Sequence, residues 1–216
     1  MAPNPKYTDF KVVVLGEGRV GKTSLILRYV RQIFAENQQA TIQASFLTKK
    51  LTLGNSRVQL AIWDTAGQER FHALGPIYYR DADAALLVYD ITDRDSFNRV
   101  KNWVKELRKF VQKEIVVVIA ANKQDLARNQ QIPDEESQEY AKSIKAGHFK
   151  TSAKAGKGVE HMFLHISRQL LAQKSAEIST AAASGGSGPR GTVTTGRRSV
   201  IISDEPAGSD AKSSCC

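Results

Sequence analysis

The order of apolar and polar residues along this chain predicts alternating strands and helices. Continuous or alternating apolar runs predict six strands, at 10–15, 45–53, 56–64, 84–91, 115–121 and 148–151. Apolar residues at helical spacing predict helices at 21–33, 93–112, 133–145 and 159–174. This alternation predicts an α/β fold, with a mostly parallel six-stranded sheet and helices on both faces. Gly54 and Asn55 predict a hairpin turn, which adds one antiparallel edge strand.

The chain has 216 residues, enough for one domain and a tail. We expect a short polar arm at 1–9 and a folded domain over 10–174. Residues 175–216 are rich in Ala, Ser, Gly and Thr and have little to bury, so we expect a disordered tail. No apolar run reaches about 18 residues, so the sequence predicts no membrane-spanning helix. The N-terminal segment lacks the apolar core of a signal peptide, so we do not expect secretion.

The segment GEGRVGKTS, at 16–24, lies between the first predicted strand and the first predicted helix. The spacing from its first glycine to GKT is typical of a phosphate-binding loop. Glycines let backbone N–H groups approach phosphate oxygens, and the start of the following helix favours an anion. Lys22 is expected to reach the β- and γ-phosphates, and the Thr23 hydroxyl to bind Mg²⁺. A chance match in a glycine-rich turn is the alternative, and the strand–loop–helix order argues against it.

Residues outside this loop supply the other parts of a nucleoside triphosphate site. Asp64 ends a predicted strand and is placed to hold Mg²⁺, directly or through water. Gly67 would offer a backbone N–H to the γ-phosphate, and Gln68 would orient the attacking water. Thr41, in a polar loop, would complete the Mg²⁺ shell only when the γ-phosphate is present. Each residue alone also fits a simple turn or cap, but together their spacings favour the site.

Two further segments indicate that the base is guanine. NKQD, at 122–125, follows a buried strand, and the Asp125 carboxylate can accept from N1–H and the 2-amino group of guanine. Adenine lacks both donors in that position, and an unpaired buried carboxylate is costly. SAK, at 152–154, follows the next short strand and would present a backbone N–H to guanine O6. Both segments lie at carboxyl ends of strands, where open α/β sheets bind ligands.

The charge distribution and the cysteine content indicate which partners and which compartment to expect. The formal net charge is +9. Residues 175–216 carry equal numbers of basic and acidic side chains, so the whole excess lies in 1–174. That excess is spread over predicted helix surfaces without a nucleic-acid motif, so we expect no nucleic-acid partner. Cys215 and Cys216 are the only cysteines, and adjacent cysteines cannot cross-link a core, so we expect a reducing compartment.

The segments GEGRVGKT, Thr41, DTAGQ at 64–68, NKQD and SAK resemble the guanine-nucleotide motifs of the Ras superfamily. The resemblance covers about residues 9–174 and implies the Ras-like form of the P-loop NTPase fold. Further stretches resemble the Rab family: IQASF at 42–46, RFHALGPIYYR at 70–80, LLVYDIT at 86–92 and the Cys-Cys pair. Within that family, IQASF and the GEGRVGKTS loop are most similar to the early-endosomal members.

The resemblance implies a GTP hydrolase that acts as a molecular switch. GTP would order the loops 34–46 and 65–80, and hydrolysis to GDP would release them. Gln68 is the implied catalytic residue. The implied Mg²⁺ ligands are Thr23, Thr41 and Asp64. The residues implied to bind GTP or GDP are Gly16, Gly18, Arg19, Val20, Gly21, Lys22, Thr23, Ser24, Phe34, Thr41, Asp64, Gly67, Asn122, Lys123, Asp125, Ser152, Ala153 and Lys154.

Several other residues have a role implied by the family and a simpler alternative. Phe34 resembles the aromatic residue that packs edge-on against guanine, with a core contact at the helix end as the alternative. Members of the Rab family have an aromatic triad on which effectors dock, and this chain resembles it at Phe46, Trp63 and Tyr78. The alternative is that these residues pack inside the fold. Arg19 departs from the small or neutral residue usual at its place. It either projects outward or contacts the nucleotide.

Cys215 and Cys216 resemble the Rab site for two geranylgeranyl groups, with unmodified thiols as the alternative. The resemblance implies the cytoplasmic face of membranes, at the early endosome, with a cytosolic pool. The implied partners are an exchange factor, a GTPase-activating protein, a GDP-dissociation inhibitor, a Rab escort protein with geranylgeranyl transferase, and membrane effectors. A non-hydrolysing GTP-bound scaffold and a P-loop kinase are the alternative functions. Gln68 argues against the scaffold, and NKQD argues against the kinase.

Overall fold

The computed structural model describes residues 6–42, 44–65, 78–111 and 113–184. Its elements, in chain order, are β1 (Thr8–Leu15), α1 (Lys22–Arg31), β2 (Ser45–Leu53), β3 (Ser56–Asp64), β4 (Ala84–Asp90), α3 (Arg94–Phe110), β5 (Val116–Asn122), the 3₁₀ helix η2 (Gln124–Asn129), α4 (Asp134–Ser143), β6 (Gly147–Lys150) and α5 (Val159–Ser184). All predicted strands are present. Except at the end of α5, the boundaries lie within two residues of those predicted. β1 begins at Thr8, so the predicted polar arm is shorter by its last two residues.

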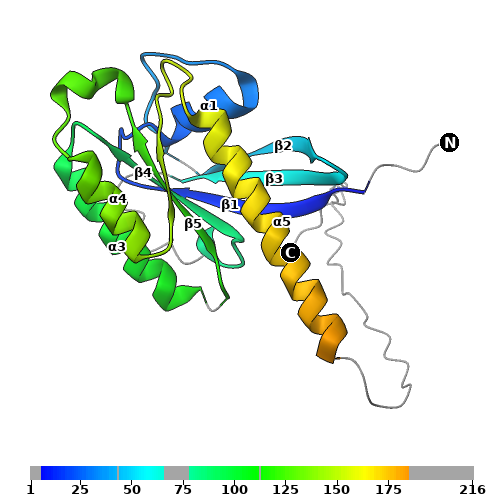
Figure 1. Ribbon diagram of the computed structural model, residues 1–216. Coiled ribbons are helices and arrows are strands. Elements are labelled where there is room, and N and C mark those ends of the chain that lie inside the picture. The colour runs from blue at the N-terminus through cyan, green and yellow to red at the C-terminus, as the bar shows by residue number, and fades with distance from the viewer. Residues whose placement is uncertain (1–5, 43, 66–77, 112, 185–216) are drawn as a thin grey trace, which may run out of the picture.

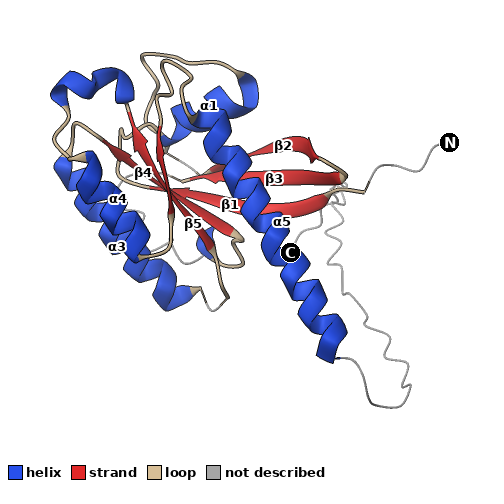
Figure 2. Cartoon of the chain, viewed as in Figure 1, coloured by secondary structure: helices blue, strands red, loops and turns tan. Residues whose placement is uncertain are grey.

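The six strands form one sheet in the order β2-β3-β1-β4-β5-β6 (Figure 2). β2 runs antiparallel to β3 at one edge, and the other neighbouring strands pair in parallel. This arrangement confirms the predicted parallel sheet with one antiparallel edge strand. Parallel strands point the same way, so the loops that follow β1, β5 and β6 and the carboxyl end of β3 meet at one edge of the sheet.

Helices cover both faces of the sheet, as predicted. In Figure 1, α1 and α5 lie on one face, and α3 and α4 lie on the other. Phe163 of α5 stacks on Tyr29 of α1, with ring centroids 4.0 Å apart. On the opposite face, Phe97 of α3 packs against Tyr89 and Tyr140, at centroid distances of 5.0 and 6.0 Å. Burying one such side chain contributes about 1.5–3 kcal/mol, so these contacts fix the helices against the strands that carry the site.

The start of α3 is set by a helix cap. The Asp93 carboxylate accepts hydrogen bonds from the backbone N–H groups of Asp95 and Ser96, so Asp93 precedes the helix that it was predicted to begin. The buried Ser96 hydroxyl accepts a hydrogen bond from the backbone N–H of Asp90, at 3.0 Å. This bond joins the first turn of α3 to the end of β4.

The last helix is longer than the sequence predicts. α5 continues to Ser184, whereas the sequence predicts a helix that ends at 174 and a disordered tail from 175. Residues 175–180 are exposed, so burial does not hold them. They extend a helix already nucleated on the core, and adding residues such as Ala, Glu and Ser to an existing helix costs little. Residues 185–216 lie outside the described residues. None of the described helices is long and apolar enough to span a membrane.

Candidate functional site

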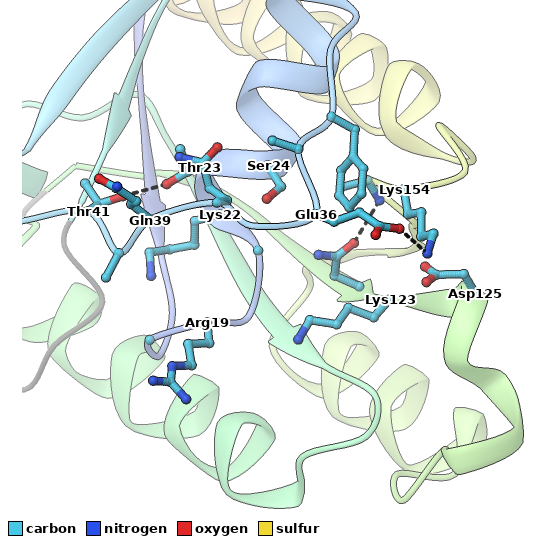
Figure 3. A pocket seen from close by; sticks show the side chains of 18 residues that line it. Arg19, Lys22, Thr23, Ser24, Glu36, Gln39, Thr41, Lys123, Asp125 and Lys154 are labelled. Carbon is cyan, nitrogen blue, oxygen red and sulfur yellow. Dashed lines mark hydrogen bonds and ion pairs between the residues drawn. The ribbon is translucent and has the colours of Figure 1, made fainter.

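A pocket of about 610 Å³ opens at the carboxyl edge of the sheet (Figure 3). It is bounded by the loops after β1, β5 and β6 and by the polar loop between α1 and β2. Its volume suits a nucleotide-sized ligand. The lining residues are Gly18, Arg19, Gly21, Lys22, Thr23, Ser24, Phe34, Ala35, Glu36, Gln38, Gln39, Ala40, Thr41, Asn122, Lys123, Asp125, Ala153 and Lys154.

This lining differs from the predicted nucleotide residues in two ways. Predicted residues that are buried behind the lining are Gly16, Val20, Asp64 and Ser152. Lining residues that no motif predicts are Ala35, Glu36, Gln38, Gln39 and Ala40. Their loop is polar and aperiodic, so only its position in the fold identifies it as a pocket wall. Gly67 and Gln68 lie outside the described residues.

Lys22 holds the phosphate-binding loop from within. Its Nζ donates hydrogen bonds to the carbonyl oxygens of Gly16 and Glu17, each at 2.9 Å, and the residue is only 5% exposed. Burial lowers the pKa of Lys22 to about 8, against the opposing charges of Asp64 and Glu17. The ammonium group is therefore still mostly protonated at neutral pH. A phosphate placed in the loop would stabilise that charge.

Asn122 joins three segments behind the pocket. Its Nδ2 donates to the Val20 carbonyl at 2.8 Å, and its Oδ1 accepts from the Thr151 hydroxyl at 3.3 Å. The backbone N–H of Ala153 also donates to Oδ1, at 3.4 Å. A Cβ on Gly21, where φ is +96°, would lie 2.5 Å from Asn122 Nδ2. The loop after β1 can approach β5 this closely because residue 21 is glycine.

The three predicted Mg²⁺ ligands meet at one point. The Thr23 hydroxyl lies 2.7 Å from the Thr41 hydroxyl and donates to Oδ2 of Asp64, also at 2.7 Å. Burial raises the pKa of Asp64, while the Thr23 hydrogen bond, the Lys22 charge and the Thr41 hydrogen bond oppose the shift. Oδ1 of Asp64 is buried and has no hydrogen-bond partner among the described residues. A free carboxylate oxygen beside two hydroxyls matches the oxygen donors that Mg²⁺ prefers.

The predicted base-recognition residues lie at the other end of the pocket. Oδ1 of Asp125 accepts a hydrogen bond from the Ser152 hydroxyl, which holds the carboxylate beside the loop after β6. Lys123 Nζ pairs with Oδ2 of Asp90 at 2.6 Å, which ties this segment to the end of β4. Figure 3 shows Asp125 and Lys154 close together, across the pocket from the threonines that meet Asp64.

Arg28 supports the base end of the pocket, although no sequence motif identifies it. Its Nε and Nη2 donate to the carbonyl oxygens of Ala153 and Lys154, at 2.8 and 3.0 Å. Its guanidinium carbon lies 5.8 Å from the ring centroid of Phe34. Phe34 packs against the core and also lines the pocket. Glu36, on the same loop as Phe34, pairs with Lys154 at 2.7 Å.

Arg19 lies at the rim of the pocket. Its side chain is exposed, and its backbone adopts the left-handed region, with φ of 64°. Figure 3 shows the guanidinium directed away from Thr23 and Thr41. Of the two predicted alternatives, the structure shows the outward orientation.

The three predicted effector residues form one aromatic row, with two on the sheet and Tyr78 in the segment before β4. Phe46 and Trp63 are directly opposite each other on β2 and β3, and their ring centroids are 5.6 Å apart. Trp63 lies 6.5 Å from Tyr78, again between ring centroids. Phe46 is 59% exposed, so the row presents apolar surface to solvent as well as packing its rings together.

Comparison with known proteins identifies the family. The sequence model of the Ras family matches residues 11–172. The chain is 54% identical over 209 residues to the Ras-related protein Rab-21 of Homo sapiens, which covers 96% of this chain and 91% of the human protein. It is 50% identical over 170 residues to Rab-21 of Dictyostelium discoideum, which covers 79% of this chain and 80% of that protein. The chain therefore belongs to the Ras family, within its Rab branch, and is a GTPase.

Proposed function

We propose that this GTPase is a Rab-type switch that binds Mg²⁺–GTP in the pocket and recruits effectors in that state. The observation that carries the proposal is the contact of Thr23 with Thr41 and Asp64. These residues come from the phosphate loop, the polar loop before β2 and the end of β3. A ligand bound at their meeting point would hold all three segments, and loss of its γ-phosphate would release the polar loop.

The residues at this point fit a magnesium nucleotide. Asp64 Oδ1 and the Thr23 and Thr41 hydroxyls would hold Mg²⁺, which when bound would neutralise charge on the β- and γ-phosphates. Lys22 would exchange its two carbonyl partners for phosphate oxygens. The backbone N–H groups of the loop and the start of α1 would bind the remaining phosphate charge.

Guanine would be selected by the carboxylate of Asp125. The Ser152 hydroxyl already holds one oxygen of this group, which limits its movement. Guanine offers two donors to the carboxylate, whereas adenine would leave it unpaired, a loss of about 1–3 kcal/mol or more. Arg28 and Asn122 position the SAK segment, which would present a backbone N–H toward guanine O6.

Hydrolysis is proposed to need help from a partner protein. Gln68 would orient the water, and an activating protein would insert an arginine, which accelerates such reactions roughly 10³–10⁵-fold. Gly18 lines the pocket without a side chain and leaves room for that arginine. We expect Gln68→Leu to retain GTP binding and to lose nearly all stimulated hydrolysis in a single-turnover assay. Normal stimulated turnover by this variant would contradict the assignment.

The finer cellular role is part of the proposal. Effectors would dock on the aromatic row of Phe46, Trp63 and Tyr78. Cys215 and Cys216, which lie outside the described residues, would carry two geranylgeranyl groups added with a Rab escort protein. The chain would then act on the cytoplasmic face of early endosomes in vesicle traffic. An exchange factor and a GTPase-activating protein would set its nucleotide state, and a GDP-dissociation inhibitor would hold a cytosolic pool.

The proposal is tested by identifying the nucleotide that the purified protein carries. After denaturation, chromatography is expected to find close to one guanine nucleotide per chain. Adenine nucleotide would contradict the role of Asp125 and favour a P-loop kinase. Bound GTP that is never hydrolysed, even with activating protein, would favour the non-hydrolysing scaffold. An empty site that refuses added Mg²⁺–GTP would contradict the switch altogether.

A further inference from the structure

Basic side chains gather at the end of the sheet that lies opposite the nucleotide pocket. The pocket is at the carboxyl end of β1, whereas Lys6 precedes the amino end of that strand. Arg57 lies at the β2–β3 turn, paired with Thr52. Lys50 of β2 and Lys174 of α5 complete the group. We call Lys6, Lys50, Arg57 and Lys174 the basic end. In Figure 1, the start of β1, the β2–β3 turn and the end of α5 lie on the same side of the molecule.

Two of these cations are held over aromatic rings near the start of β1, one just before the strand and one within it. Lys50 Nζ lies 5.0 Å from the ring centroid of Tyr7, and Lys174 Nζ lies 5.5 Å from that of Phe10. Phe10 faces the α1–α5 core. Leu51 of β2 packs against the same core, so its neighbour Lys50, with the Tyr7 ring beneath it, lies on the opposite side of the sheet. The two lysines therefore lie beside the start of β1 on opposite faces of the sheet. The aromatic rings hold their side chains in place, so these do not move freely in solvent.

The charge of the basic end is not neutralised within the described part of the chain. No described carboxylate lies within ion-pair distance of its four cations. Exposed cations elsewhere do have such partners, as in the pairs Arg94–Glu136 and Lys113–Asp83. The nearby Asp9 carboxylate instead accepts a hydrogen bond from Gln59, at 2.8 Å. Glu177 of α5 only partly offsets the positive charge.

The position of α5 and the charge of the C-terminal tail indicate what kind of partner the basic end binds. α5 leaves the domain here and carries an apolar side chain, Ile178, which is 63% exposed one helical turn beyond Lys174. Residues 175–216 have equal numbers of basic and acidic side chains, so the tail itself adds no net attraction to anionic lipid. Any such attraction has to come from the folded domain. The cations of the basic end, with the apolar side chain of Ile178 beside them, suit the interface of an anionic bilayer.

We propose that the basic end binds the surface of an anionic lipid bilayer and turns the nucleotide pocket and the aromatic row away from it. This inference rests on the proposed action of the chain at membranes, but it does not require lipid attachment to Cys215 or Cys216. The domain would supply the second, electrostatic signal that its neutral tail lacks. Binding should weaken with salt, because the attraction is screened within a Debye length.

The test uses the full chain without lipid groups, loaded with GDP, and sedimentation with vesicles. The wild type is expected to bind vesicles rich in phosphatidylserine, not vesicles of phosphatidylcholine alone, and to dissociate as salt rises from about 0.1 M to about 1 M.

The double variant Lys50→Glu, Lys174→Glu should lower the partition coefficient at least about tenfold, since each cation near such a surface contributes roughly fivefold. The matched control Lys105→Glu, Arg128→Glu makes the same charge change at exposed positions away from the basic end. It should bind distinctly more tightly than the first variant.

A second measurement reports the orientation of the folded domain on the bilayer. Cys215 and Cys216 are the only cysteines, so maleimide-bearing lipids would attach the chain at that point alone. Hydrogen exchange at the β2–β3 turn should then slow on anionic vesicles but not on neutral ones. Equal effects of the two double variants, equal binding to both vesicle types, or unchanged exchange would each overturn the proposal. Nucleotide content and hydrolysis are measured on the same preparations. If those are normal when vesicle binding fails, the failure belongs to the basic end and not to the switch.

Discussion

At the residue scale, Asn122 shows how a motif residue can act through the fold. The sequence assigns it to guanine recognition, but in the structure its amide bonds to Val20, Thr151 and Ala153. It therefore positions the phosphate loop and the SAK segment relative to each other. Its loss would disturb both ends of the pocket, because one side chain fixes the spacing between them.

We expect Gly21→Ala to disrupt this junction. The added Cβ would lie 2.5 Å from Asn122 Nδ2, and the backbone has φ of +96°. Backbone strain and the broken Asn122–Val20 bond should together cost roughly 2–4 kcal/mol of stability. Urea unfolding measures the loss, and filter binding should show weaker GTP affinity. Gly54→Ala is the control, since φ there is +57° but nothing lies within 4 Å of the new Cβ. Similar losses in both variants would refute the role of Asn122.

His148 makes stability depend on pH. Burial lowers the pKa of His148, and Lys150 adds to the shift while Asp134 opposes it. Its Nε2 has no hydrogen-bond partner among the described residues. The unfolded chain therefore holds this proton more tightly, so the free energy of unfolding should fall as pH drops below about 6.5.

Urea unfolding at several pH values between about 5 and 7 checks this sign. His148→Asn should flatten the pH dependence by removing one linked proton. If His148→Asn keeps the full slope, other groups cause the pH dependence.

At the element scale, α5 consists of two parts with different support. Residues 159–170 bury Phe163 and Ile166 against α1 and the sheet. Residues 175–180 are exposed, and their described hydrogen bonds are made within the helix, such as that from the Ser175 hydroxyl to the Leu171 carbonyl at 2.9 Å. Stability should therefore be unequal along one continuous helix.

We expect Ile178→Pro to unwind the exposed end of α5 and to change the free energy of unfolding by less than about 0.5 kcal/mol. Circular dichroism should show a small loss of helix signal. Phe163→Ala, in the buried part, should cost about 3–5 kcal/mol because it removes the stack on Tyr29. A large destabilisation by Ile178→Pro would show that residues beyond 174 belong to the cooperative unit.

At the scale of the whole molecule, one ligand would hold segments that are far apart in the sequence. Thr23, Thr41 and Asp64 lie in the first turn of α1, the loop before β2 and the end of β3. Thr41 belongs to a loop, which can respond to a ligand, while Thr23 and Asp64 are anchored in regular structure. Release of the ligand should thus loosen the pocket wall and leave the core intact.

Chelating Mg²⁺ should speed release of bound nucleotide at least about tenfold, a change of about 1.4 kcal/mol. Without the cation, the Asp64 carboxylate would face phosphate charge directly. Fluorescent-GDP release with and without EDTA measures the effect. Asp64→Asn removes that repulsion, so its release should respond much less to EDTA, whereas the remote Asp9→Asn should respond like the wild type. An unchanged EDTA response in Asp64→Asn would argue against a metal site at this carboxylate.

Much of the fold and of the site was predictable because the signals are local. Buried strands are apolar throughout, the GEGRVGKTS loop has fixed spacing, and NKQD and SAK directly follow strands. These features predict the parallel sheet and the edge at which the pocket opens, which the structure bears out. Other features have no local signal. Arg28 and Glu36 gain their positions from contacts more than one hundred residues away along the chain, with Ala153 and Lys154.

The sequence by itself determined the element order, the phosphate loop and the residue types needed for Mg²⁺ and guanine. It could do so because spacing and periodicity act over a few residues. Only the tertiary structure decided that Asn122 bridges two loops, that Arg19 points outward, and that α5 continues to Ser184. It also decided that cations without an ion-pair partner among the described residues gather around the start of β1. These features depend on which distant segments the sheet brings together, and burial, hydrogen bonding and charge are properties of that arrangement.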